Sequence, residues 1–211
     1  MIIAVDGPAA SGKGTIAKAL ARHYNLPHLD TGLLYRAVAA TVRRLELDPS
    51  KEADAVAACG FDELTLADPV LRSDEIGQLA SVVSAHPLVR AALLQRQKRF
   101  AHQEGGAILD GRDIGTVIAP DADAKLFVKA TPQVRARRRH NELQARGSSL
   151  SFDRVLADIR ARDQRDSARS TAPLIQAADA ATLDTSFLSI DASVNKAIEI
   201  VEARVALKRR G

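Results

Sequence analysis

An apolar run followed by a glycine-bounded loop opens the chain, and it constrains the fold more than any other stretch. Residues 2–5 are Ile-Ile-Ala-Val, and the loop that follows runs from Gly7 to Gly12 and ends in Lys13. Apolar residues at helical spacing come next. A buried strand, a glycine loop and a helix in this order direct backbone N–H groups and the positive end of a helix dipole into one small concavity. The stretch therefore predicts a phosphate-binding loop in an α/β fold.

The loop has the spacing of a P-loop, Gly-x-x-x-x-Gly-Lys. Lys13 is placed to reach the outer phosphates of a nucleoside triphosphate, while the first hydroxyl comes at Thr15, after Gly14. We expect Thr15 to contact Mg²⁺ directly or through water. A glycine-rich turn without a ligand is the alternative, but the flanking strand and helix favour phosphate binding. The expected ATP-binding residues are Gly7, Pro8, Ala9, Ala10, Ser11, Gly12, Lys13, Gly14 and Thr15.

Composition excludes several classes of protein. The chain has 30 Lys and Arg residues against 26 Asp and Glu residues, a formal charge of +4, so an anionic partner is expected. Aromatic residues make up only 3% of the chain and there is no tryptophan, unlike proteins that stack nucleic-acid bases. No apolar run has the length of a membrane span. We therefore expect neither a nucleic-acid nor a membrane partner.

The only cysteine, Cys59, cannot form an internal disulfide, and no basic-then-apolar signal segment precedes the first strand. Both observations favour a cytoplasmic protein. Cys59 lies in an alanine-rich stretch and is expected to be a structural thiol. The length of 211 residues suits a single α/β domain, which we expect to be a monomer.

Strands and helices alternate along the rest of the chain. Apolar strand candidates at 106–109, 125–129 and 181–183 join the first strand, and helical periodicity separates them. This alternation predicts a doubly wound parallel sheet. Residues 48–73 show no sustained period, and a short helix with fragments of strand is expected there.

Two arginine-bearing helices are predicted between the third and fourth of these strands, joined by Gly147-Ser148-Ser149. The spacing of the arginines places them in one stripe on each helix. A single arginine is better explained by a solvated ion pair, but the two stripes together favour a lid that closes on phosphates. The stripes comprise Arg135, Arg138 and Arg139 on the first helix, and Arg162, Asp166 and Arg169 on the second.

These cations exceed what one nucleotide needs. Arg36 follows a helix start capped by Asp30 or Thr31, and Arg112 follows the strand at 106–109. Two phosphorylated substrates would account for the excess. Phosphoryl transfer requires alignment and cations rather than covalent chemistry, and an acceptor phosphate that is already ionised needs no general base.

Taken together, the motifs resemble those of the bacterial cytidylate kinases, a family of nucleoside monophosphate kinases. In such kinases a glycine follows the P-loop lysine, as Gly14 does here. The resemblance covers nearly the whole chain. Its specific parts are Gly111-Arg112-Asp113 and the later arginine and aspartate series. The matching positions are Asp30-Thr31-Gly32, Tyr35-Arg36, Ser81, Arg90, Asp110-Gly111-Arg112-Asp113-Ile114-Gly115-Thr116, Arg162, Asp166 and Arg169.

The resemblance implies a three-layer α/β/α P-loop fold with a parallel five-stranded sheet, a mostly helical monophosphate-binding insertion and a short arginine-rich lid. It implies phosphorylation of CMP and dCMP by ATP with Mg²⁺, in pyrimidine nucleotide metabolism. The family usually carries a longer insertion with a small antiparallel sheet, for which residues 60–73 leave little room. The expected parts are a core of 1–46, 103–134 and 170–211, an insertion at 47–102, and a lid with flanking helices at 135–169.

The resemblance also implies a role for each matching residue. A carboxylate, an arginine and a hydroxyl suit the donor and acceptor groups on the edge of cytosine. Lys13 and Arg112 are expected to be catalytic, together with the lid residues Arg135, Arg138 and Arg139. The CMP-binding residues are Arg36, Arg112 and Arg169 for the phosphate, Ser81, Arg90 and Asp113 for the base, Tyr35, Arg162 and Asp166 for the sugar, and Thr31.

Two alternatives stay open from the sequence. One is a P-loop kinase for another acceptor, such as UMP, another nucleoside monophosphate or a small alcohol. The other is a nucleotide-dependent switch or RNA-binding module that uses the basic helices as its footprint. Against a switch, Asn195-Lys196-Ala197 lacks the aspartate of a guanine-reading motif.

Overall fold

The computed structural model describes residues 1–208, and its centre is a five-stranded sheet in the order β2-β3-β1-β4-β5. β1 pairs in parallel with β3 and β4, and β4 pairs in parallel with β5. The predicted parallel sheet with alternating helices is confirmed. The strands are β1 (Ile2–Asp6), β2 (His28–Asp30), β3 (Ala107–Gly111), β4 (Ala124–Lys129) and β5 (Ala181–Asp184).

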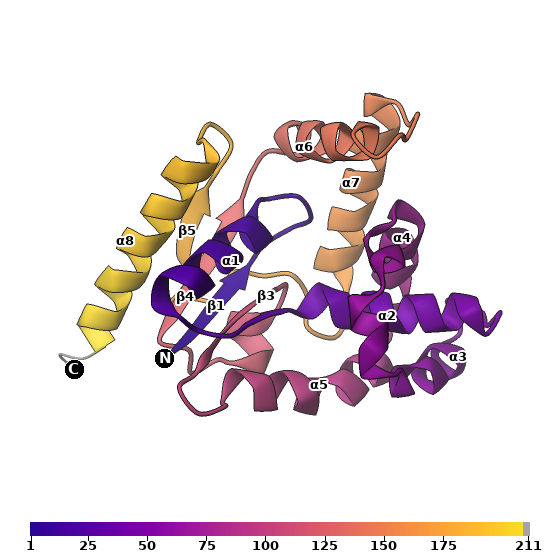
Figure 1. Ribbon diagram of the computed structural model, residues 1–211, viewed down its shortest axis with the longest axis horizontal. Helices are drawn as coiled ribbons and strands as arrows, with labels where there is room; N and C mark the ends of the chain where they lie inside the picture. The colour runs from indigo at the N-terminus through magenta and orange to yellow at the C-terminus, as the bar shows by residue number, and fades with distance from the viewer. Residues whose placement is uncertain (209–211) are drawn as a thin grey trace. The chain divides into compact units, whose positions relative to one another are not determined.

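The α-helices alternate with these strands and occupy the long connection between β2 and β3 (Figure 1). Within residues 1–208, no helix combines the length and the apolar character that a membrane span requires. The helices are α1 (Lys13–Tyr24), α2 (Thr31–Arg44), α3 (Glu52–Ala57), α4 (Asp74–Val83), α5 (Pro87–Ala101), α6 (Pro132–Gln144), α7 (Phe152–Ala168) and α8 (Ile190–Lys208).

The strand fragments expected within 48–73 are wrong. After α3 the chain forms short 3₁₀ turns, among them Glu63–Ala67 and Pro69–Arg72. The side chains of Asp62 and Asp68 accept hydrogen bonds from the N–H groups of the second residues of these turns, at 2.9 and 2.8 Å. Aspartates that bond to nearby backbone in this way favour turns over strands.

The chain forms two compact units. One unit contains Met1–Leu29 and the chain from Phe100 onward, and the other contains Asp30–Arg99. The insertion expected at 47–102 falls mostly within the second unit. In that unit α2 packs against α4, and Asp30 caps α2 by accepting a hydrogen bond from Gly32 at 3.0 Å. The expected cap at Asp30 or Thr31 is therefore Asp30.

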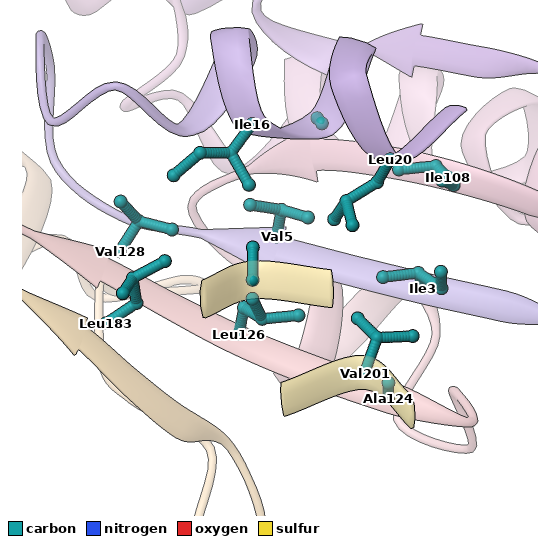
Figure 2. Close-up of a cluster of buried hydrophobic side chains, with 12 residues drawn as sticks. Ile3, Val5, Ile16, Leu20, Ile108, Ala124, Leu126, Val128, Leu183 and Val201 are labelled. Carbon is teal, nitrogen blue, oxygen red and sulfur yellow. The ribbon is translucent and has the colours of Figure 1, made fainter. Parts of the chain in front are cut away.

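The core of the first unit lies between the sheet and the pair α1 and α8, which contact each other beside it (Figure 1). Figure 2 shows Ile16 and Leu20 extending from α1 toward Val5 of β1. The opposite face of the same strands is also buried, because Ala4 and Leu109 have no exposed surface. Burial of both faces explains why β1 and β3 are continuous apolar runs instead of alternating ones.

Two glycines allow the P-loop to join β1 to α1. A Cβ atom at Gly7 would lie 2.1 Å from the carbonyl oxygen of Val128, so no side chain fits there. Gly12 precedes α1 with φ of 93°, a left-handed conformation that glycine adopts without steric cost. Between them Ala10 also holds a positive φ, of 58°. Such strain in a non-glycine residue is often found where backbone is shaped around a ligand.

Candidate active site

The P-loop places Lys13 at the first turn of α1, next to a carboxyl group of β3. Its Nζ lies 4.0 Å from Oδ2 of Asp110, at the end of β3, and the side chain of Asp110 is only 2% exposed. His28 of β2 contacts the other oxygen of this carboxylate, with Nε2 to Oδ1 at 2.8 Å. A buried carboxylate between a histidine and a lysine holds the lysine side chain near the loop.

A cavity of about 630 Å³ opens beside the P-loop. Its volume falls in the range of small-molecule sites. Apolar side chains and hydroxyl groups share its lining, and two arginines from α6 lie on one side. The lining residues are Ala10, Gly12, Thr15, Ile16, Arg138, Arg139, Glu142, Thr185, Leu188, Ser189, Ile190 and Ser193.

Arg138 is bound to the P-loop and to the end of β5. Its guanidinium donates to the carbonyl oxygens of Ser11 and Thr185, at 3.3 and 2.7 Å, and to the Thr185 hydroxyl at 3.0 Å. The Thr185 hydroxyl donates in turn to Ser11 O at 2.9 Å. Arg139, also on the cavity wall, pairs with Glu142 at 2.9 Å. Two cations therefore face the cavity in defined positions.

Arg135 is held differently from the other two arginines of its stripe. It is only 3% exposed, and its terminal nitrogens form a bidentate pair with Asp163 of α7 at 2.8 and 2.6 Å. It also donates to the carbonyl of Ala9 in the P-loop at 3.3 Å. The residue ties α6 to α7 and to the P-loop, and it is not among the residues that line the cavity.

A second cluster of cations surrounds Asp166 of α7. Arg112 donates from Nε to its carboxylate at 2.7 Å, and Nη2 of Arg169 lies 3.7 Å from the other oxygen. Burial works to raise the pKa of Asp166, but Arg112, Arg162 and Arg169 outweigh it and hold the pKa below its usual value. The structure therefore brings these residues together around one buried carboxylate. The excess of positive charge suits an anion.

Of the remaining predicted residues, Asp113 is buried in the first unit, and Thr31, Tyr35, Arg36, Ser81 and Arg90 lie in the second. The guanidinium of Arg90 lies 5.3 Å from the centre of the Tyr35 ring, and its Nη1 donates to the carbonyl of Ser84 at 3.2 Å. Arg36 donates to the carbonyl of Leu71 at 2.6 Å. Ser81 is buried on α4, as is Thr31 at the start of α2.

Three residues of this site did not stand out in the sequence. Thr185 lines the cavity and bonds the P-loop, and His28 contacts Asp110. Asp6 ends β1 with its carboxylate buried. Each lies at or just beyond the carboxyl end of a sheet strand or on the adjoining strand β2. The rule that ligands bind beyond the carboxyl ends of parallel strands could have marked Thr185 and Asp6.

The comparison with known proteins identifies the family of this chain. The family model described as cytidylate kinase matches residues 3–203 of the chain. This chain belongs to the cytidylate kinase family. A curated cytidylate kinase of Xanthobacter autotrophicus is 60% identical over 206 residues, covering 98% of this chain and 99% of that protein. One of Rhodopseudomonas palustris is 56% identical over 211 residues, covering both chains completely.

Solved structures share the fold of this chain. A sugar kinase from a Janibacter species matches with a TM-score of 0.51 at 15% identity, over 97% of this chain and 95% of that one. An uncharacterised protein from Eubacterium ventriosum matches with a TM-score of 0.56 at 15% identity, over 96% and 99% of the two chains. At this level of identity the likeness concerns the fold alone.

Proposed function

We propose that this chain transfers the γ-phosphoryl group of ATP to CMP or dCMP, giving ADP and CDP or dCDP. The observation that carries the proposal is the gathering of Arg112, Arg162 and Arg169 around the carboxylate of Asp166, in the same unit as the P-loop cavity. One phosphate site serves the donor, and the second cluster of cations serves a phosphorylated acceptor. Membership of the cytidylate kinase family supports cytidine nucleotides as that acceptor.

The donor nucleotide would occupy the P-loop and the cavity next to it. The backbone N–H groups at the start of α1 and the Lys13 ammonium bind the phosphates. Arg138 and Arg139 face the same cavity and supply positive charge where negative charge builds up on the transferring phosphoryl group. The residues proposed to contact ATP remain Gly7, Pro8, Ala9, Ala10, Ser11, Gly12, Lys13, Gly14 and Thr15.

The Mg²⁺ that accompanies ATP fits the oxygen donors of this site. Thr15, in the first turn of α1, is one of the residues that line the cavity and carries a hydroxyl group. Mg²⁺ binds hard oxygen ligands and keeps several waters, so one hydroxyl together with phosphate oxygens is sufficient on the protein side. Thr15 would hold the ion directly or through water. When bound, the ion neutralises charge on the phosphates.

In the acceptor site, Arg36, Arg112 and Arg169 would bind the phosphate of CMP. The base would contact Ser81, Arg90 and Asp113. The sugar would contact Tyr35, Arg162 and Asp166. The remaining CMP-binding residue would be Thr31. An oxygen of the acceptor phosphate attacks the γ-phosphorus as the bond to the bridging oxygen of ADP breaks. The acceptor is already ionised, so alignment and cations provide the catalysis.

Arg135 would act on the phosphates indirectly, through the residues that it holds in place. The sequence predicts a lid residue, but the bidentate bond of Arg135 to Asp163 and its contact with Ala9 support a positioning role. In this role it fixes α6 and α7, and therefore Arg138, Arg139 and Asp166, relative to the P-loop.

A panel of acceptors tests the function directly. ADP release is measured with CMP, dCMP, UMP, AMP and shikimate at equal concentrations. We expect turnover with CMP and dCMP to exceed that with every other acceptor. Faster turnover on UMP, AMP or shikimate would reassign the enzyme to another acceptor. Salt-dependent RNA binding without turnover of any acceptor would favour a binding module instead.

A further inference from the structure

Asp6 occupies the junction between the sheet and the P-loop. It is the last residue of β1 and directly precedes Gly7. Its side chain is buried, and its two carboxylate oxygens accept hydrogen bonds from two consecutive backbone N–H groups. Oδ1 accepts from Ile114 and Oδ2 from Gly115, both at 2.8 Å.

These bonds fix the far end of the loop that carries Arg112 and Asp113. The near end of the same loop is fixed by the backbone, because Gly7 N–H donates to the carbonyl of Gly111 at 3.3 Å. Asp6 is also the partner of Gly111 in the β1–β3 register. Arg112 and Asp113, two of the residues proposed to bind the acceptor, therefore lie between two attachments. Both attachments lead to the start of the P-loop.

We propose that Asp6 is a positioning residue that sets the distance between the donor phosphate loop and the acceptor-binding loop 111–115. The inference rests on the proposed function, since it concerns the alignment of its two substrates. Small displacements of reacting groups have large effects on rate, with a shift of about 1 Å costing up to roughly 100-fold. A carboxylate that joins both loops controls such a displacement.

The surroundings leave the loop little freedom to shift while Asp6 keeps both bonds. A Cβ atom at Gly115 would lie 3.4 Å from Oδ2 of Asp6 and 3.1 Å from Cδ of Lys125. The loop is therefore packed between Asp6 and the aliphatic part of a β4 side chain. The Lys125 ammonium points elsewhere and donates to the carbonyl of Pro120 at 2.6 Å and to Asp179 at 3.0 Å.

The burial of Asp6 makes its hydrogen bonds sensitive to pH. Burial raises the pKa of Asp6 to about 7, although the N–H groups of Gly115 and Ile114 act against the rise; Asp113 adds to it and Arg112 opposes it. A protonated carboxyl group carries a hydrogen on one oxygen, and that oxygen is a poorer acceptor for an N–H group. The bond to one loop residue weakens when Asp6 is protonated.

Asp6→Asn tests the inference, because the amide has the same shape but presents a donor to one of the two N–H groups. We expect kcat with CMP to fall by about 10 to 100-fold and KM for ATP to change by less than about threefold. Wild-type kcat should decline below about pH 7, and the ratio of wild-type to variant kcat should shrink along that limb. The ionisation of the CMP phosphate affects both proteins and cancels in the ratio.

Asp123→Asn is the matched control. Its carboxylate accepts a hydrogen bond from Ile2 N–H at 2.8 Å, at the opposite end of β1 from the P-loop. This variant should keep wild-type kcat and the wild-type pH profile. Unchanged kcat in Asp6→Asn would overturn the inference. A fall in kcat that stays the same fraction at every pH, and that Asp123→Asn reproduces, would also overturn it.

Amide hydrogen exchange supplies a readout that needs no turnover. The Ile114 and Gly115 amides should exchange more rapidly in Asp6→Asn than in the wild type, while core amides of β1 stay protected. Equal protection of the two loop amides would overturn the inference. If the wild-type protein exchanges as expected but turns over no cytidine nucleotide, the proposed function fails and the loop connection stands. If Asp6→Asn does not fold, the wild-type pH profile and the exchange rates of its loop amides on either side of about pH 7 decide the question.

Discussion

The guanidinium of Arg135 and the carboxylate of Asp163 form a two-point ion pair that joins α6 to α7, with nitrogen–oxygen distances of 2.8 and 2.6 Å. Arg135 is buried and also bonds to Ala9 in the P-loop, so the pair connects three segments. Such a connection stabilises the fold and orients the site at the same time.

Removal of one partner leaves a buried charge without its counterion, which is the costly way to break such a pair. We expect Asp163→Ala to lower the free energy of unfolding by about 3 kcal/mol, as measured by urea denaturation. The control is Asp158→Ala on the same helix. Asp158 pairs with the largely exposed Arg154 at 3.4 Å, so its loss should cost less than about 1 kcal/mol. Equal effects of the two substitutions would contradict a special role for the buried pair.

Lys13→Ala should abolish most turnover, because Lys13 serves the donor phosphates as charge moves onto them. A loss in kcat of at least about 100-fold is expected, by analogy with the removal of one transition-state donor. The affinity for CMP, measured by calorimetry without ATP, should change little. Lys18→Ala, on the exposed face of the same helix, is the control and should leave kcat near the wild-type value. Loss of CMP binding in Lys13→Ala would place the lysine in the acceptor site instead.

Asp113→Ala should raise KM for CMP and relax the choice of base, if Asp113 reads the exocyclic amine of cytosine. The ratio of kcat/KM for CMP over AMP should fall by about 10-fold or more. Asp121→Ala is a suitable control, since Asp121 lies later in the same connection between β3 and β4 but is exposed and pairs with His102 at 3.0 Å. An unchanged CMP to AMP ratio in Asp113→Ala would show that another residue reads the base.

The ionisation of Asp6 should make the folded protein less stable as the pH rises. The pKa of Asp6 is raised from 3.8 to about 7 by burial, so the folded protein binds a proton more tightly than the unfolded chain. Its contribution to stability is full below the unfolded pKa of 3.8 and is lost as the pH rises through the folded pKa of about 7. Across this window the wild type should lose up to about 1.4 kcal/mol per pH unit relative to Asp6→Asn.

Urea unfolding of the two proteins at a series of pH values measures this difference. Asp166 cannot mimic it, because its pKa is lowered and its contribution is lost only as the pH falls through that lowered pKa. A difference between wild type and Asp6→Asn that stays constant across the window would mean that Asp6 keeps one protonation state throughout.

Local sequence patterns were sufficient for most of the fold. The apolar run of β1, the P-loop glycines and the helical spacing after Asp30 depend on neighbouring residues, and each led to the element found. The 48–73 segment did not follow from its pattern, because the side chains of Asp62 and Asp68 form their turns by local hydrogen bonds that leave no hydrophobic period.

Contacts between residues far apart in the chain could not be predicted from the sequence. The spacing of Arg135, Arg138 and Arg139 placed them on one face, but it could not reveal that Arg135 pairs with Asp163 on another helix. In the same way, the partners of Asp6 are the backbone N–H groups of Ile114 and Gly115, far along the chain. Backbone groups carry no residue identity, so no pattern of residue types could have marked them.

Gly7 is needed both for the P-loop and for the packing of the sheet. The space that its absent Cβ would fill is occupied by the carbonyl oxygen of Val128, 2.1 Å away, so any larger residue must push β1 away from β4. A defect caused by replacing this glycine would therefore be an assembly defect as well as a binding defect. Surveys of inactive variants at this position would count failures of folding together with failures of nucleotide recognition, unless protein yield is measured alongside activity.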